Sequence, residues 1–130
     1  MSTEIRYLTY VTVLTALLWI PYVLNMIRVR GLADAVGYPV NPRPLARWAA
    51  RLKSAHYNAI ENLAVFATLV LVAHTAGISS RATEMSCVVY FWARLAHPLA
   101  YVLAIPWVRT LAFVGGFAAQ LCIARAILQA

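Results

Sequence analysis

The chain has 130 residues, of which 63 % are hydrophobic and 12 % are charged, and its formal net charge is +7. Soluble domains carry about 25 % charged residues, so this composition excludes an ordinary soluble protein and indicates a membrane protein. The positive charge does not indicate a nucleic-acid partner, because most of the cations lie next to apolar runs, where they set membrane topology.

Four apolar runs approach the roughly 20 residues that a helix needs to cross a hydrocarbon core. They extend over Tyr7 to Ile27, Leu63 to Ala76, Met85 to Ile105 and Trp107 to Leu128. We therefore predict an all-α integral membrane protein with a single domain, residues 1–130. Its helices are expected at about 4–30, 44–76, 80–103 and 106–129.

The first run is too long for the apolar core of a signal peptide, and it has neither a basic leader nor a small-residue cleavage site. We expect it to stay as a helix with a kink at Pro21. The segment 31–43 is rich in Gly and Pro and predicts the one long loop, after which Pro44 suits the first turn of the second helix.

Cations are concentrated between the first two apolar runs, at Arg28, Arg30, Arg43, Arg47, Arg51 and Lys53. The next connection offers only Arg81 against Glu84. By the positive-inside rule the first loop is cytoplasmic, which places both chain termini on the non-cytoplasmic side.

The second helix carries a polar face that continues without a turn signal into its apolar part. At 100° per residue, one arc of about 100° holds Arg47, Arg51, Ser54, Asn58, Glu61 and Asn62. An ionised side chain at membrane depth costs roughly 2.5 to 3.5 kcal/mol, so these groups should face a partner or a wet cavity.

The third helix carries a second polar stripe, with Tyr90, Arg94, His97 and Tyr101 spaced i, i+4, i+7 and i+11. Two such stripes predict a shared cavity. One alternative is that the stripes only pair with each other, for example Glu61 with Arg51 or Arg94. The surplus of cations over acids favours instead an anionic ligand held by Arg–carboxylate contacts.

Arg109 follows Pro106 in the first turn of the fourth helix, where the macrodipole already disfavours a cation. An anion should compensate it, and with the Tyr101 hydroxyl it could stabilise a thiolate or an oxyanion. The alternative is that Arg109 extends to lipid phosphate. Cys87 and Cys122 lie within predicted membrane helices, so we expect neither a disulfide nor a metal site.

Three motifs resemble the MAPEG family, the membrane-associated proteins of eicosanoid and glutathione metabolism. They are R-x-x-x-A-H-x-N-x-x-E from Arg51 to Glu61, R-L-A-H-P-L-A-Y from Arg94 to Tyr101, and Arg109. The resemblance covers nearly the whole chain. It implies a four-helix bundle that assembles as a homotrimer, with glutathione sites between subunits that open to the cytoplasmic side.

The same resemblance implies roles for individual residues. Arg28 or Arg30 of one subunit would hold a glutathione carboxylate, and Asn58 and Glu61 would bind the tripeptide's backbone and amino group. Another group of residues would line the neighbouring helix or complete the glutathione site, namely Arg51, Tyr90, Arg94, His97 and Tyr101. Arg109, with Tyr101, would stabilise the thiolate.

Two positions depart from the family pattern, because Ser54 and Tyr57 stand where some branches carry arginine. We therefore keep three hypotheses. The first is a glutathione transferase or peroxidase that acts on a lipophilic electrophile or hydroperoxide. The second is a non-catalytic lipid-binding or scaffold protein. The third is an ion-coupled transporter that uses Glu61. The position of the polar groups, near one membrane interface and not at the midplane, argues against this hypothesis.

Overall fold

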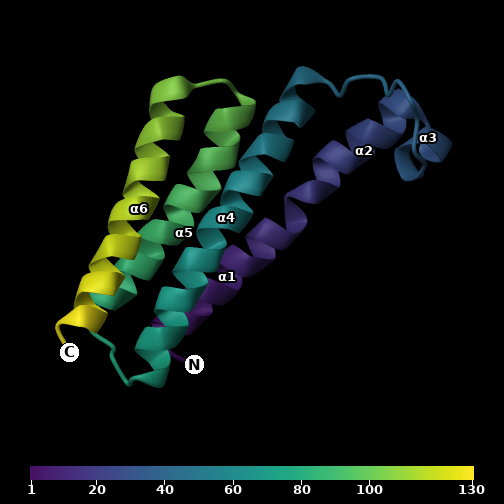
Figure 1. Ribbon diagram of the computed structural model, residues 1–130. Helices are drawn as coiled ribbons and strands as arrows, with labels where there is room; N and C mark the ends of the chain where they lie inside the picture. Colours follow the sequence, from purple (N-terminus) through teal and green to yellow (C-terminus); the bar gives the residue numbers. More distant parts are fainter.

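The computed structural model describes all 130 residues, and they form helices only, which confirms the all-α prediction. The six helices are α1 Thr3–Leu17, α2 Trp19–Arg30, α3 Leu32–Val36, α4 Arg47–Thr75, α5 Arg81–Val102 and α6 Pro106–Leu128. In Figure 1 the long helices lie side by side as antiparallel rods, and both termini lie at the same end of the bundle. At the other end α2 leans away from α5 and α6 and carries α3 outside the bundle.

Three of the rods are long and apolar enough to cross a membrane, namely Thr3–Arg30, Arg47–Thr75 and Pro106–Leu128. They support a multi-pass membrane protein. α5 has 22 residues and is not among these three rods. A fourth span through α5 therefore stays a prediction.

The first rod is interrupted at Leu18, between α1 and α2, and not at Pro21 itself. At this point the Leu18 N–H donates to the Thr15 carbonyl at 3.3 Å, in a tighter turn than an α-helix makes. Pro21 has no N–H, and its ring crowds the carbonyl of Leu17, four residues earlier. The distortion caused by the proline therefore lies one turn towards the N-terminus.

Two side-chain contacts hold α2 against α4 after this break. The Tyr22 hydroxyl and His56 Nδ1 are 2.8 Å apart in a buried hydrogen bond. Asn25 Oδ1 accepts from the Ala46 N–H at 3.0 Å, which anchors the residue directly before α4. Thus α4 begins at Arg47, later than the predicted residue 44.

The connection between α2 and α4 is closed at its base, because Arg30 Nε donates to the Arg43 carbonyl at 2.7 Å. Within it the chain forms the short helix α3, where the sequence predicted only a loop. Gly31 ends α2 with φ +81°, a conformation that glycine adopts at no steric cost, and the Ala-rich residues that follow favour a new helical turn.

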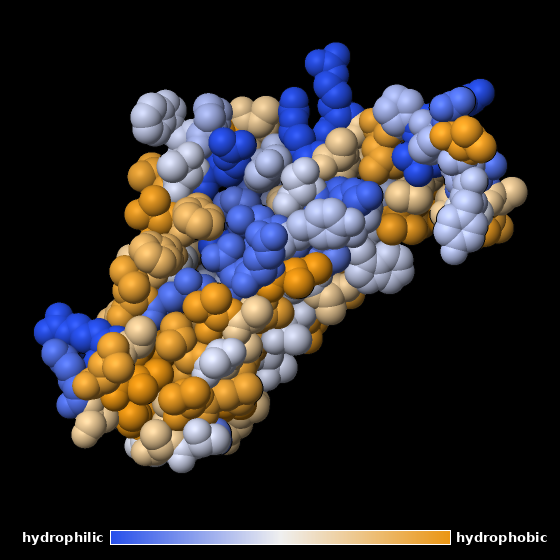
Figure 2. Space-filling model, in the orientation of Figure 1, coloured by the Kyte–Doolittle hydropathy of each residue, from blue (hydrophilic) through white to orange (hydrophobic).

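The larger apolar cluster lies in the half of the bundle that holds the termini, and a smaller one of Tyr22, Ala49 and Leu52 lies between α2 and α4. The larger cluster consists of Val11, Phe66, Val70, Ala73, Cys87, Tyr90, Ala119 and Ile123. Figure 2 shows polar side chains concentrated in the middle and upper part of the visible face, above a mainly hydrophobic lower part that has a polar group at its left edge. The fold thus places its site at the end opposite the termini.

Glu4 ties the first turn of α1 to the first turn of α5. Its carboxylate is only 5 % exposed, and one oxygen accepts from Ser79 Oγ and Thr83 Oγ1, both at 2.8 Å. Thr83 also forms a capping box with Ser80 at the start of α5. The carboxylate therefore fixes α1 relative to α5 through the residues that begin α5.

We expect Glu4→Ala to destabilise the bundle by roughly 2 to 3 kcal/mol, because the buried Thr83 hydroxyl and the exposed Ser79 hydroxyl lose a charged acceptor. Thermal unfolding in detergent measures the effect. Glu84→Ala, at an acid in the first turn of α5 outside this contact, is the control and should cost much less. Equal midpoints for the two variants would contradict the role of Glu4.

Candidate functional site

A polar cavity of about 320 Å³ opens between α4, α5 and α6 in the upper half of the bundle. It is lined by Asn58, His97, Tyr101, Arg109, Thr110 and Phe113. A smaller cavity of about 180 Å³ adjoins it near the α5–α6 connection, lined by Arg51, Ala100, Tyr101, Ala104, Ile105, Pro106 and Arg109. Tyr101 and Arg109 line both, so the two cavities form one site with no acidic side chain among its lining residues.

Arg109 lies over the face of Tyr101, with its guanidinium carbon 5.0 Å from the ring centroid. This cation–π contact holds the guanidinium at the boundary between the two cavities. α6 starts at Pro106 with no side-chain cap, so the positive end of its macrodipole is not compensated by a side chain. Both features make the site attractive to an anion.

Arg94 is 2 % exposed and lies behind the cavity, between α4 and α6. Its Nη1 donates to Asn58 Oδ1 at 3.0 Å, so its partner is a neutral amide and not Glu61. The guanidinium carbon is 5.3 Å from the Tyr90 ring centroid and 5.7 Å from that of Phe113. Nε and Nη2 have no hydrogen-bond partner. The cation is therefore buried without a carboxylate.

Arg51 and His97 complete the cavity walls. Arg51 Nη1 donates to the Val102 carbonyl at 3.3 Å, near the C-terminal end of α5, where a cation is favoured. His97 is buried beside Tyr101, with ring centroids 5.7 Å apart, and its Nδ1 has no partner.

The structure of one chain brings together some of the predicted site residues and separates others. Asn58, His97, Tyr101, Arg109 and Arg51 line the two cavities, and Arg94 contacts Asn58 directly.

Besides Arg94, which lies behind the cavity, four predicted residues line neither cavity. Tyr90 is buried in the apolar core, stacked on Phe66 with centroids 3.8 Å apart. Glu61 is exposed on α4. Arg28 is exposed on α2, and Arg30 is engaged with the loop, on the helix that leans away in Figure 1.

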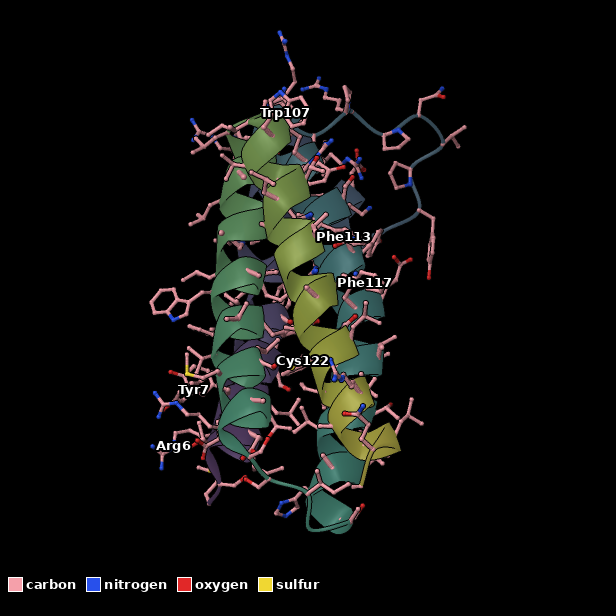
Figure 3. All side chains as sticks on the ribbon, turned by 90° about the vertical axis from the view of Figure 1, so that its left-hand side faces the viewer. Arg6, Tyr7, Trp107, Phe113, Phe117 and Cys122 are labelled. Atoms are coloured by element: carbon pink, nitrogen blue, oxygen red, sulfur yellow. The ribbon has the colours of Figure 1, made fainter.

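On α6 the sequence analysis identified Arg109 but missed the rest of its face, although that face carries a periodic signal. Arg109, Phe113, Gly116 and Gln120 follow the same i, i+4, i+7, i+11 spacing as the stripe on α5. Phe113 closes the cavity, and Gln120 Nε2 donates to the Asn62 carbonyl at 3.1 Å. Figure 3 shows Phe113 and, one turn further along α6, Phe117 below Trp107 at the end of the bundle.

The model of the MAPEG family matches residues 8–129 of the chain, which is nearly its whole length. No curated protein gives a significant match.

The contact between Arg94 and Asn58 yields a stability prediction. Asn58→Leu should lower the free energy of unfolding by roughly 2 to 3 kcal/mol, because it leaves a buried cation without its acceptor. Asn58→Asp supplies an acceptor with a countercharge and should keep the wild-type thermal midpoint or exceed it.

Asn62→Leu is the matched control for this pair, because the Asn62 amide bonds only its own helix, at the Asn58 carbonyl. It should cost less than Asn58→Leu. If both leucine variants unfold alike, or if Asn58→Asp is as unstable as Asn58→Leu, the Arg94 contact does not stabilise the fold.

Proposed function

Because the chain belongs to the MAPEG family, a membrane family that includes glutathione transferases and related enzymes, we propose that it binds glutathione and activates its thiol as a thiolate. The second substrate is a lipophilic electrophile or hydroperoxide that arrives from the membrane. The thiol lies in the cavity bounded by Asn58, His97, Tyr101 and Arg109.

One observation carries this proposal: cationic groups converge on a cavity whose lining contains no acid. Arg51 and Arg109 line it, and the uncapped start of α6 adds a partial positive charge. Glutathione supplies two carboxylates and an ionisable thiol. Bidentate contacts of arginine with carboxylates match that chemistry.

Arg109 and Tyr101 are the proposed catalytic residues. A free thiol has a pKa of about 8.5, and a neighbouring guanidinium lowers it because the thiolate gains a countercharge. In conjugation, the thiolate sulfur bonds to the electrophilic carbon, and the leaving group departs with the bonding electrons. With a hydroperoxide, the sulfur attacks the terminal oxygen, the O–O bond breaks, and the alkoxide leaves and is protonated to the alcohol. A second glutathione thiol then attacks the sulfenic acid sulfur, and the disulfide forms as the S–O bond breaks and water leaves.

The proposed assembly is a homotrimer, which would place Arg28, Arg30 and Glu61 in a shared site. These residues lie outside the cavity of their own chain, so a contribution from them requires a neighbouring copy. Arg51, Asn58, Arg94 and His97 would bind or support the tripeptide, whereas Tyr90, in its stack with Phe66, would act only through packing. We place the cavity end on the cytoplasmic side and both termini on the other side.

A second candidate function is non-catalytic lipid binding, and a specific feature favours it. A groove of about 380 Å³ between α1, α2, α4 and α5 is lined only by apolar side chains, among them Leu14, Pro21, Trp48 and Pro98. Ser54 and Tyr57, where some branches of the family carry arginine, are both exposed and add no cation. This reading predicts stabilisation by lipid without thiolate formation.

Thiolate formation separates the two functions. Glutathione added to the detergent-solubilised protein near pH 7 should produce thiolate absorbance in the ultraviolet, and Arg109→Ala should reduce it about tenfold or more, because the thiolate loses its countercharge. Arg125→Ala is the control, since this arginine lies on the same helix at the opposite end.

Wild-type thiolate in the Arg109→Ala protein would remove Arg109 from the mechanism. Absence of thiolate from the wild-type protein, together with stabilisation by phospholipid, would replace the enzyme proposal by the lipid-binding one.

A further inference from the structure

Gly116 on α6 leaves the space that the Arg94 guanidinium occupies. A methyl group placed at Gly116 would lie 2.9 Å from Arg94 Nη2 and 3.3 Å from Nε. Carbon and nitrogen atoms in van der Waals contact are about 3.5 Å apart, so the guanidinium would have to move. A methyl group at the adjacent Gly115 would meet nothing within 4 Å.

The guanidinium has little freedom to move. The rings of Tyr90 and Phe113 lie near it, and its Nη1 is bonded to Asn58 Oδ1 at 3.0 Å. We therefore expect a displacement of a few tenths of an ångström away from α6 to change the geometry of the bond to Asn58.

This bond also decides which way the Asn58 amide points. A guanidinium is only a donor, so the atom it holds must be the amide oxygen. The amide nitrogen is left for the cavity, which Asn58 lines together with Tyr101 and Arg109. With its oxygen bonded to Arg94, Asn58 keeps the amide nitrogen as the atom that can donate a hydrogen bond to a ligand in the cavity.

We infer that Gly116 is a positioning residue. Because it has no side chain, the Arg94 guanidinium can pack against α6 and hold the Asn58 amide in one orientation. The site then selects a ligand that offers an acceptor oxygen to the Asn58 amide nitrogen. The identity of that ligand rests on the proposed function. If it is glutathione, Asn58 takes a carbonyl or carboxylate oxygen of the tripeptide and not its amino group.

The test compares two neighbouring glycines. Gly116→Ala should raise the dissociation constant of glutathione about tenfold, the loss expected for one oriented hydrogen bond to a charged or polar group. Gly115→Ala should change it less than about twofold, although both substitutions raise helix propensity equally. Isothermal titration in one detergent measures both. Equal affinities for the two variants would overturn the inference.

A double-mutant cycle separates positioning from a general packing role. Lysine at position 94 has one slim ammonium and no Nη2 to meet the new methyl group, yet it can still donate to Asn58. In the Arg94→Lys background, Gly116→Ala should therefore leave the dissociation constant unchanged within about twofold. The same tenfold loss in both backgrounds would show that the glycine acts independently of Arg94 and would refute the inference.

Thermal unfolding of the four proteins of this cycle, namely wild type, the two single variants and the double variant, tests the contact between Gly116 and Arg94 without a ligand. Gly116→Ala should lower the midpoint when residue 94 is arginine and leave it nearly unchanged in the Arg94→Lys background. If this coupling appears while the wild-type protein binds no glutathione, the proposed function fails and the positioning of Arg94 stands. If the coupling is absent, the inference fails whatever the protein binds.

Discussion

The site depends on a guanidinium that is buried between helices without a carboxylate. Removing a cation from water costs several kcal/mol, and a neutral amide and aromatic faces compensate only part of it. Arg94 has Asn58, Tyr90 and Phe113 for this purpose, and two of its nitrogens remain without partners. Such an arrangement ties α4, α5 and α6 together and keeps the surrounding region positive.

The two halves of the bundle differ on either side of Arg94 and its contacts. One half holds the larger apolar cluster, and at its end the carboxylate of Glu4 joins α1 to the start of α5. In the other half α2 leans away from α5, and cavities lie where side chains would otherwise pack. The lining residues of the larger of these two cavities all lie on the helices α4, α5 and α6, which suits a site that needs fixed geometry.

Much of the fold was predictable because the hydrophobic runs are long and the helix boundaries carry Gly and Pro. The position of the first break was not, since Pro21 acts on a carbonyl one turn before it. The family was recognised from the motifs between Arg51 and Tyr101, and the family match over residues 8–129 confirms it.

The sequence predicted which residues of the candidate site share a helix face, but not how deeply each side chain is buried. Helical spacing shows which residues share a face, yet it does not show that Tyr90 ends in the apolar core while Tyr101, on the same stripe, reaches the cavity. Similarly, Glu61 lies at the exposed side of the arc that contains Asn58. Gly116 could not be found at all from its residue type, because its contribution is the absence of a side chain beside a residue on another helix.

The central claim is that the cationic site is completed by a small acidic ligand. Native mass spectrometry of the protein released from detergent, with glutathione and with its diethyl ester, tests this most directly. The account predicts saturable binding of glutathione and at least about tenfold weaker binding of the ester, since the arginines lose their carboxylate partners. Equal binding of the two compounds, or no binding of glutathione, would contradict it.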